Sequence, residues 1–598
     1  MSKRDTPVQP KPGTNACAPF DRERAGMWAR TRRYAVPRWM IEEAAERRLA
    51  GDWRGACAAA GVDVAFDLAE VARQDGPAIA EALEDDLRHL APDLLRWHLP
   101  RLEPQWSTQT MITPRRVIVL RAYDRPRLRA TLQIVTPEGV GGQRLTLRFG
   151  SVAVGTAKTS RTELDWSAAR HVWDVRHAHE LLARHGSLDR APFFNADGTP
   201  RRPDQLPTEN PGPDDPVRLA EWITLLHDRG EVERAFVAAN VALEIDEARR
   251  HGVDLLDALR SSVLALHRLR PELRRLAREG IVRNWHVPIG EQVTHWVLRY
   301  FVATVEQTDD PTCPGDGLRL TLHREMSPAE RRRQGRPAVA TVPLPDVYWR
   351  RLPDLELLRA GRLTPDDLHP LVRSALFPAR DAPRDGRPIG PPDPGPLPVI
   401  RVRCRGVWHR VSYQGGVLHT HDHTEEERRR EQALKAFGGK VVGCFAVRQG
   451  WTSTGRMPRA LRVQRNELFH RMRHGDTPGV LRMLDLGHDP HARDGEGTTL
   501  LHLIGHVDHR LLLPRLLAAG LDLEASDERG HTPLFRAVAW GASADVVRAL
   551  VDAGARTDVH GYVYPGGDVN LAELIDIRRR RDLDFLKERI AAQGERNT

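Results

Sequence analysis

Residues 527–560 read DERGHTPLFRAVAWGASADVVRALVDAGARTDVH, and this stretch decides the fold of the C-terminal part of the chain. The hydroxyl of Thr532 can cap a helix, and Pro533 takes a first-turn position where no amide proton is needed. From 546 to 551 the apolar residues recur three and four positions apart, which predicts the buried stripe of a second helix. Gly554 is suited to the left-handed residue that ends it. The stretch therefore predicts two consecutive short helices.

Glycine spacing indicates that this pattern repeats toward the N-terminus. The interval between Gly497 and Gly530 equals that between Gly487 and Gly520, and Gly554 follows Gly520 after the same interval to within one position. A fixed period of about 33 residues is typical of a solenoid, in which each unit buries its apolar face only against its neighbours.

The unit resembles the ankyrin repeat, with its D-x-x-G-x-T-P-L-H start and V-V-x-x-L-L-x-x-G-A second helix. Phe535 departs from the pattern, because the family has His at that position. The preceding unit, 494–526, has Leu500 where the family has proline, and a degenerate unit, 466–493, suits an N-terminal cap. The resemblance implies an all-α ankyrin solenoid with a C-terminal cap over residues 461–598.

Ankyrin proteins bind other proteins through a concave face made of hairpin tips and first-helix surfaces, and the resemblance implies the same use here. The candidate contact residues are Glu496, Glu528, Arg529, His531, Arg536 and Trp540. An exposed tryptophan beside an arginine is a candidate hot-spot pair, although Trp540 can equally pack between repeats. A purely structural cap within the same chain is the alternative role of the array.

Composition bounds the rest of the molecule. A chain of 598 residues corresponds to about four domains, and 40% hydrophobic with 29% charged residues is typical of a folded protein. The five cysteines include no CxxC pair, which argues against a disulfide framework. No apolar run reaches about 18 residues and the first 20 residues lack a signal-peptide core, so we predict a cytoplasmic protein without membrane contact.

The charge is nearly balanced, with 90 basic and 81 acidic residues giving a net +9. Three arginine clusters, 331–333, 428–430 and 578–581, lie in segments that also contain Glu or Asp, which is typical of solvated faces. We therefore do not expect a nucleic-acid partner.

The N-terminal part shows internal similarity. Residues 51–96 align without a gap to residues 230–275, with 13 identities in 46 positions. Downstream, WHLP at 97–100 recurs as WHVP at 285–288. We interpret this as a tandem duplication in which each copy is a helical bundle followed by a small antiparallel sheet; a shared bias toward Ala, Leu and Arg is the alternative.

The sequence thus predicts an α+β multidomain protein of the following segments: a flexible arm at 1–36, an α+β copy at 37–190, a linker at 191–215, a second copy at 216–377, a Pro-rich linker at 378–398, a small α+β segment at 399–450, and the array at 461–598. In the small segment, Thr424 and Glu427 predict a capping box, and VVGCFAVRQ at 441–449 predicts a closing strand.

Catalytic and metal-binding chemistry receives little support. The run HTHDH (His419, His421, Asp422 and His423) suggests a metal site with Cys404, His409 and Cys444 as distant ligands, but it lies where a polar strand-to-helix junction is expected anyway. We therefore predict no metal and no cofactor. No nucleophile, P-loop, zinc-protease or dinucleotide-binding motif is present, and we assign no catalytic residue.

The sequence favours a protein-interaction scaffold that recruits a protein partner through the array. The alternative is an enzyme or effector whose site lies between the two copies, with the array selecting the substrate. A pocket shared by His98 and His286 would favour that alternative. The whole chain also resembles Arg-rich ankyrin proteins of high-GC bacteria, and this resemblance implies no activity for the N-terminal part.

Overall fold

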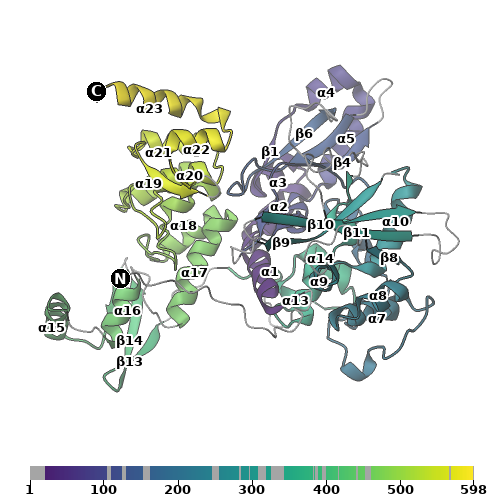
Figure 1. The fold of residues 1–598 in the computed structure, drawn as a ribbon, viewed down its shortest axis with the longest axis horizontal. Coiled ribbons are helices and arrows are strands. Elements are labelled where there is room, and N and C mark those ends of the chain that lie inside the picture. The colour runs from purple at the N-terminus through teal and green to yellow at the C-terminus, as the bar shows by residue number, and fades with distance from the viewer. Residues whose placement is uncertain are drawn as a thin grey trace.

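The structure is a computed structural model. It describes residues 20–103, 109–123, 130–151, 162–186, 188–245, 255–281, 284–294, 297–307, 318–324, 342–381, 383, 388–393, 399–414, 417–438, 442–451, 459–563 and 567–596. Three parts lie in order along the chain: an N-terminal unit (20–393), a small module (399–451) and the C-terminal array (459–596). The array stands as a column beside the N-terminal unit, and the module lies below the column (Figure 1).

The first half of the N-terminal unit combines helices with a five-stranded sheet of order β1-β6-β5-β4-β7. Its helices are α1 (Arg22–Tyr34), α2 (Arg38–Leu49), α3 (Trp53–Ala59), α4 (Leu68–Asp75), α5 (Pro77–His89) and α6 (Pro92–His98). Its strands are β1 (Val62–Val64), β2 (Arg101–Leu102), β3 (Met111–Ile112), β4 (Arg116–Tyr123), β5 (Ala130–Val135), β6 (Leu145–Ser151) and β7 (Thr162–Asp165). Short 3-10 turns follow: η1 (Arg170–Val172), η2 (Ala178–Leu181), η3 (Ala183–His185) and η4 (Pro203–Gln205).

The second half has a five-stranded sheet of order β12-β9-β10-β11-β8. Its helices are α7 (Pro216–Asp228), α8 (Val232–Ala238), α9 (Leu255–Ser261), α10 (Leu266–Arg278), α12 (Asp346–Trp349), α13 (Pro353–Arg359) and α14 (Pro370–Leu376), with the 3-10 turn η6 (Pro365–Asp367). Its strands are β8 (Ala242–Ile245), β9 (Trp285–Thr294), β10 (Val297–Gln307), β11 (Leu318–Arg324) and β12 (Val342–Pro343).

The two sheets have the same pairing pattern. In each, three central strands are antiparallel, and the strand at either edge is parallel to its neighbour. The sheets are therefore mixed, and the expectation of purely antiparallel sheets is wrong. The parallel edge strands come from the helical segment before each sheet and from the chain after it, so each sheet ties its flanking helices together.

The ungapped alignment of the two halves holds over the first helices and then fails. Gly51 and Gly230, aligned with each other, both take φ of +79°, and α2–α3 and α7–α8 occupy matching positions. Farther on, WHLP lies at the end of α6, whereas WHVP begins strand β9. The two WHxP motifs are therefore not in equivalent elements.

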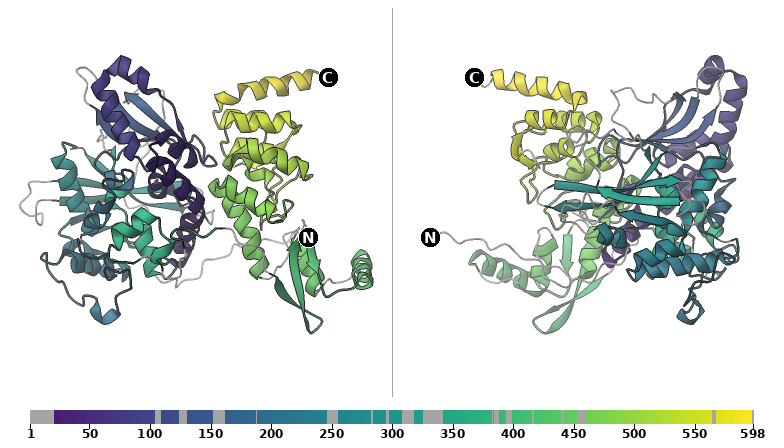
Figure 2. Two further views of the ribbon diagram at one scale, coloured as in Figure 1. Left: turned by 180° about the vertical axis from the view of Figure 1, so that it is seen from behind. Right: turned by 45° about the vertical axis from the view of Figure 1, so that its right-hand side comes forward.

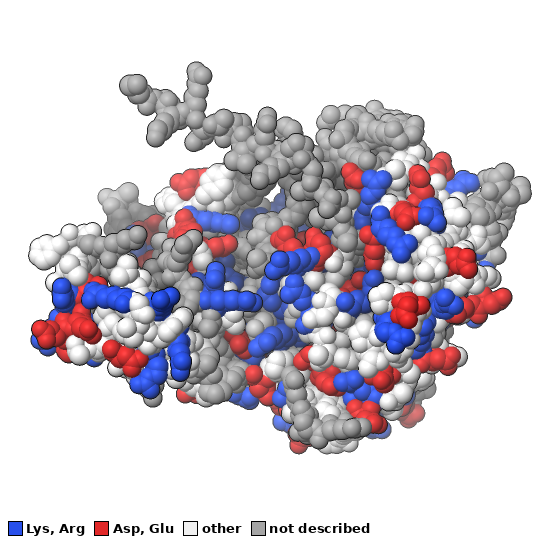
Figure 3. Space-filling view, turned by 90° about the horizontal axis from the view of Figure 1, so that it is seen from below, with Lys and Arg blue, Asp and Glu red and all other residues white. Residues whose placement is uncertain are grey.

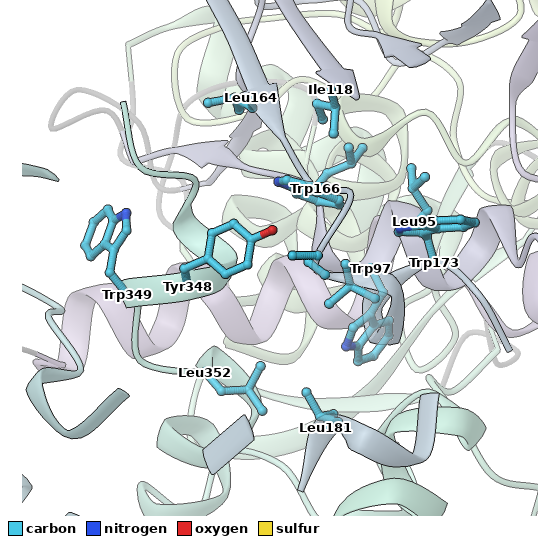
Figure 4. Packing of buried hydrophobic residues seen from close by; sticks show 14 of the residues in the cluster. Leu95, Trp97, Ile118, Leu164, Trp166, Trp173, Leu181, Tyr348, Trp349 and Leu352 are labelled. Carbon is cyan, nitrogen blue, oxygen red and sulfur yellow. The ribbon is translucent and has the colours of Figure 1, made fainter. Parts of the chain in front are cut away.

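One hydrophobic core joins both halves. Trp97, Trp166 and Trp173 of the first half and Tyr348 and Trp349 of the second belong to the same buried cluster, and Figure 4 shows these side chains close together. A buried ion pair links the halves as well, since the Arg32 guanidinium lies 2.8 Å from the Asp354 carboxylate, with side chains 3% and 0% exposed. The halves therefore form one unit and not two separate domains.

Two segments expected to be unstructured belong to this unit. Residues 22–34, within the predicted arm, form α1, because an Asp21 cap and the buried Met27 and Trp28 hold them as a helix. Residues 191–215, predicted to be a linker, begin with the buried Ala191 and Phe194, and the Phe194 ring packs 5.7 Å from that of Phe377. Both predictions missed apolar residues that the core recruits. Residues 1–19 lie outside the described residues.

The small module has a three-stranded antiparallel sheet, β13 (Ile400–Cys404), β14 (Val407–Gln414) and β15 (Val417–Thr420), followed by α15 (Glu425–Ala436) and α16 (Gly443–Trp451). The predicted capping box is confirmed, because Thr424 and Glu427 exchange hydrogen bonds of 3.1 and 3.2 Å. The predicted closing strand at 441–449 is wrong. Cys444 and Val447, three positions apart, are buried on one side of a helix.

The array stacks four helix pairs. They are α17 (Arg459–His474) with α18 (Thr477–Asp485), η7 (Leu501–His506) with α19 (His509–Ala518), α20 (Pro533–Ala539) with α21 (Ala544–Asp552), and α22 (Leu571–Ile577) with α23 (Asp584–Arg596), η8 (Arg581–Leu583) preceding the last helix. Figure 2 shows the column from behind and in an oblique view. A hairpin of β16 (His560–Val563) and β17 (Gly567–Asn570) extends from one loop, so the array is not entirely α-helical.

Among the described residues, none of the helices has the length and apolar composition needed to cross a bilayer.

Candidate functional site

Capping side chains stand at the start of several helices of the array. The Thr532 hydroxyl accepts a hydrogen bond of 3.3 Å from the Phe535 amide, as predicted, and Ser543 caps α21 in the same way. Asp508 accepts from the Arg510 amide in the first turn of α19, and Asp476 accepts from the Gly479 amide in the first turn of α18. Each cap satisfies an amide that would otherwise lack a partner, so the helix pairs begin at fixed residues.

A ladder of hydrogen bonds links the loops that connect one helix pair to the next, which we call the fingers (489–498, 522–531 and 556–563). His502 donates from Nε2 to the carbonyl of His531 at 2.9 Å, and His531 donates from Nε2 to the carbonyl of Tyr562 at 2.9 Å. The Glu528 amide donates to the carbonyl of Glu496 at 2.9 Å. Phe535, which stands where the family has His, packs its ring 4.9 Å from the His531 ring.

Five of the six candidate contact residues fall into two groups, and the sixth, Trp540, is half-buried. Glu496, Glu528 and Arg529 are exposed on two successive fingers. His531 and Arg536 are buried, at 5% and 7% exposure, so the expectation that both are exposed is wrong. Burial follows from their partners, since His531 belongs to the finger ladder and Arg536 donates to the Asp527 carboxylate at 3.0 Å and to Thr498 at 3.2 Å.

The family model for ankyrin repeats, in three copies, matches residues 468–560. These residues are ankyrin repeats. The ankyrin repeat-containing protein P1E11.10 of the fission yeast Schizosaccharomyces pombe is 41% identical over 61 residues, which are 10% of this chain and 30% of that protein. The match spans less than a third of that relative. The expected resemblance to proteins of high-GC bacteria has no support.

The N-terminal unit contacts the ankyrin array on the edge opposite the fingers, where the two helices of each pair meet. Trp39 donates from its indole nitrogen to the Asp476 carboxylate at 2.7 Å, and the Gly141 amide donates to the Trp540 carbonyl at 3.3 Å. A Cβ at Gly139 would lie 2.5 Å from the Gly541 carbonyl oxygen, so only glycine allows this approach. Trp540, predicted to contact a partner, therefore lies at a contact within the chain.

Aromatic stacking adds to the contact between the N-terminal unit and the array at α17. The Tyr34 ring of α1 stacks on His470 and His474 of α17, with centroids 5.3 and 6.3 Å apart. Burial raises the pKa of Tyr34 to about 12, with the Glu467 carboxylate adding to the shift. A groove of about 1040 Å³ is lined by both the N-terminal unit and the array, with charged residues of both signs such as Arg47, Asp63 and Asp508.

Among the described residues, the cavity between the two halves of the N-terminal unit is smaller than a typical enzyme pocket. A cavity of about 50 Å³ lies between the two halves and is lined by His98, but His286 is not among its lining residues. Burial lowers the pKa of His98 well below its ordinary value, and the nearby Arg32 adds to the shift. Small-molecule sites measure about 300 to 1,000 Å³. The enzyme alternative therefore has no support.

Of the three arginine clusters, 331–333 lies outside the described residues. Residues 428–430 lie on α15 of the module, and 578–581 lie between α22 and α23 of the array, so these two belong to different parts of the molecule. On the face seen from below, basic and acidic side chains are interspersed (Figure 3).

The small module brings together four side chains that lie far apart in the sequence: Cys404, His409, His423 and Cys444. One potential ligand atom from each lies within 4.8 Å of all the others. Of the HTHDH run only His423 joins this group, because the strand β15 ends at Thr420 and the chain turns inward before α15. His421 and Asp422 instead bond Ser412 and Arg410, near the surface.

Sequence reasoning missed two features of these sites. Tyr562, 60% exposed on strand β16 of the third finger, adds an exposed side chain to the finger that follows those of Glu496 and Glu528. The fixed period of the repeats could have identified it, since it lies about one repeat after Glu528. The Cys/His group has irregular spacing, and only the fold shows which histidine of the run belongs to it.

Proposed function

We propose that this chain recruits a protein partner through the finger edge of its ankyrin array. The observation that carries the proposal is the position of the N-terminal unit, which occupies the opposite edge through Trp39, Gly139 and Gly141. The fingers are left exposed and carry Glu496, Glu528 and Arg529 in successive repeats.

The finger ladder makes this edge a suitable recognition surface. Hydrogen bonds from His502, His531 and Glu528 fix the spacing of the fingers before any partner arrives. A surface held rigid in advance loses less conformational entropy on binding. Tyr562 adds a large exposed aromatic ring beside the charged side chains, and tyrosines are enriched among the residues that contribute most to protein interfaces.

An affinity capture with the full chain tests this proposal. The variant carries Glu496→Lys, Glu528→Lys and Tyr562→Ala, and the matched control carries Asp485→Lys and Asp552→Lys on the outer helices. Circular dichroism checks that both fold. We expect a captured protein to be lost with the finger variant and kept with the control. Equal capture by both, or none by the native chain, would contradict the proposal.

We further infer that the N-terminal unit arose by tandem duplication and acts as the platform on which the array is mounted. Three observations support this: the matching pairing pattern of the two sheets, the matching positions of α2–α3 and α7–α8, and the shared left-handed conformation of Gly51 and Gly230. Relatives with a single copy that pair as dimers through the same interface would support the inference. Relatives with different sheet orders in the two halves would argue against it.

We also propose that the protein works in a reducing, cytoplasmic setting. The described cysteines, Cys57, Cys404 and Cys444, are all free and buried. Fractionation of cells followed by detection of the chain tests this location.

A further inference from the structure

We propose that Cys404, His409, His423 and Cys444 form a zinc site that holds the small module together. Two cysteine thiolates with two histidine nitrogens are a common ligand set of structural zinc sites. The four ligand atoms lie within 4.8 Å of one another. A tetrahedral zinc ion, with bonds of about 2.0 to 2.3 Å, needs its ligand atoms about 3.3 to 3.8 Å apart, so the group needs only small side-chain adjustments to bind it.

The histidine nitrogens are oriented for a metal. His409 Nδ1 and His423 Nε2 face each other at 2.8 Å, which directs both toward one point. The other nitrogen of His423, Nδ1, lies 3.1 Å from the Glu427 carboxylate. A carboxylate behind a histidine fixes its tautomer and leaves Nε2 free as the ligand, which is the arrangement found behind zinc-bound histidines.

The backbone brings the cysteines together at glycines. Arg405 and Gly406, with φ of 50° and 91°, form the tight turn between β13 and β14 that sets Cys404 diagonally opposite His409. On the other side, a Cβ at Gly443 would lie 2.4 Å from the Cys404 sulfur. Only glycine therefore permits the first turn of α16 to bring Cys444 this close to Cys404.

The size of the module explains why it needs a metal. The buried cluster that forms its core has eight described members, two of which are the cysteines themselves and one of which, Leu461, comes from α17 of the array: Ile400, Val402, Cys404, Val411, Leu418, Cys444, Val447 and Leu461. A segment of about 50 residues with so few buried apolar side chains rarely folds stably without a disulfide or a structural metal. The two thiols are free, and two histidines beside them match a metal better than a disulfide.

Metal analysis of the purified full chain tests the proposal. We expect about one equivalent of zinc per chain, and replacement of zinc by cobalt should give the absorption bands of a tetrahedral site with thiolate ligands. Zinc content should fall to near zero in Cys444→Ser and His423→Gln. The matched controls, Cys57→Ser in the N-terminal unit and His421→Gln beside the site, should keep the full equivalent.

A further variant keeps the test decisive if the ligand variants fail to fold. Glu427→Gln leaves all four ligands in place, and we expect it to bind zinc about 10- to 100-fold more weakly, as measured by competition with a chelator. A native chain that contains no zinc and gives no tetrahedral cobalt spectrum would overturn the proposal. So would a disulfide between Cys404 and Cys444 in the freshly purified chain, or full zinc retention in Cys444→Ser.

Discussion

The ankyrin array and the Cys/His module solve the same problem, burial of a core by a short segment, in different ways. The array repeats one helix pair, so that each pair buries its apolar face against the next and the core runs continuously from Leu468 to Leu586. The module has a single small sheet, and its core cluster has only eight residues, two of which are cysteines. Repetition supplies stability to the array through packing, whereas the module depends on the polar group at its centre.

The largest effect should come from removing a large side chain from the array core. Phe535 is fully buried, and Gly561 and His531 pack against its ring. We expect Phe535→Ala to lower the free energy of unfolding by about 3 to 5 kcal/mol, because it removes apolar contacts and leaves a cavity. Equilibrium urea denaturation measures this change.

The exposed Leu511 of α19 provides the control for this prediction. It is 58% exposed, and Leu511→Ala should change the free energy of unfolding by less than about 0.5 kcal/mol. Zinc content should be the same in both variants, because the module lies outside the array core. Loss of zinc from Phe535→Ala would show that the array and the module fold as one unit. The contrast between a core built by repetition and a core built around a polar group would then not hold.

A smaller effect is expected on the pH dependence of stability, through the buried His502. Burial lowers the pKa of His502 to about 4, and the nearby Arg536 opposes protonation as well. Because the folded pKa lies below the unfolded value of about 6.5, the unfolded chain binds the proton first. The contribution of neutral His502 to the free energy of unfolding is therefore fully present above about pH 6.5 and is lost as the pH falls toward 4. At pH 5 the loss amounts to about 2 kcal/mol for this residue.

The next repeat already carries the substitution that tests this prediction, since Phe535 lies one repeat after His502 at the same position of the unit. In His502→Phe, the difference in unfolding free energy between pH 7 and pH 5 should shrink by about 2 kcal/mol, while stability at pH 7 falls by about 1 kcal/mol through loss of the hydrogen bond to His531. The exposed His560→Phe serves as control. An unchanged pH profile in His502→Phe would assign the acid sensitivity to other groups.

The same contrast explains what the sequence could predict. Each repeat of the array is determined locally, because Thr532, Pro533 and Gly554 specify helix ends within a single repeat. Three registers of that pattern make the ankyrin resemblance visible without a structure. Exposure was harder to predict, because Arg536 is buried by Asp527 and Thr498, one of which belongs to the preceding repeat.

The Cys/His group could not be predicted from short sequence patterns, for a related reason. Its ligands come from a strand end, a neighbouring strand, the turn before α15 and the first turn of α16, and the sequence does not show how these elements meet. The expectation of a strand at 441–449 would have pointed alternate residues to opposite faces. The helix that forms there instead brings Cys444 toward Cys404. The prediction of no metal was made without knowledge of the fold that assembles the group, and the metal analysis proposed above tests it.

The smallest predicted effect tests whether the helix caps of the array stabilise it independently of side-chain packing. Thr532→Ala removes the hydroxyl that accepts from the Phe535 amide and should cost about 1 kcal/mol, measured by urea denaturation. Thr532→Ser keeps the oxygen and should cost only a few tenths of a kcal/mol. If serine and alanine cost the same, the contribution of Thr532 would come from packing of its methyl group. The array would then depend on side-chain burial even at its helix ends, and its repeats would be less locally determined than the comparison with the module implies.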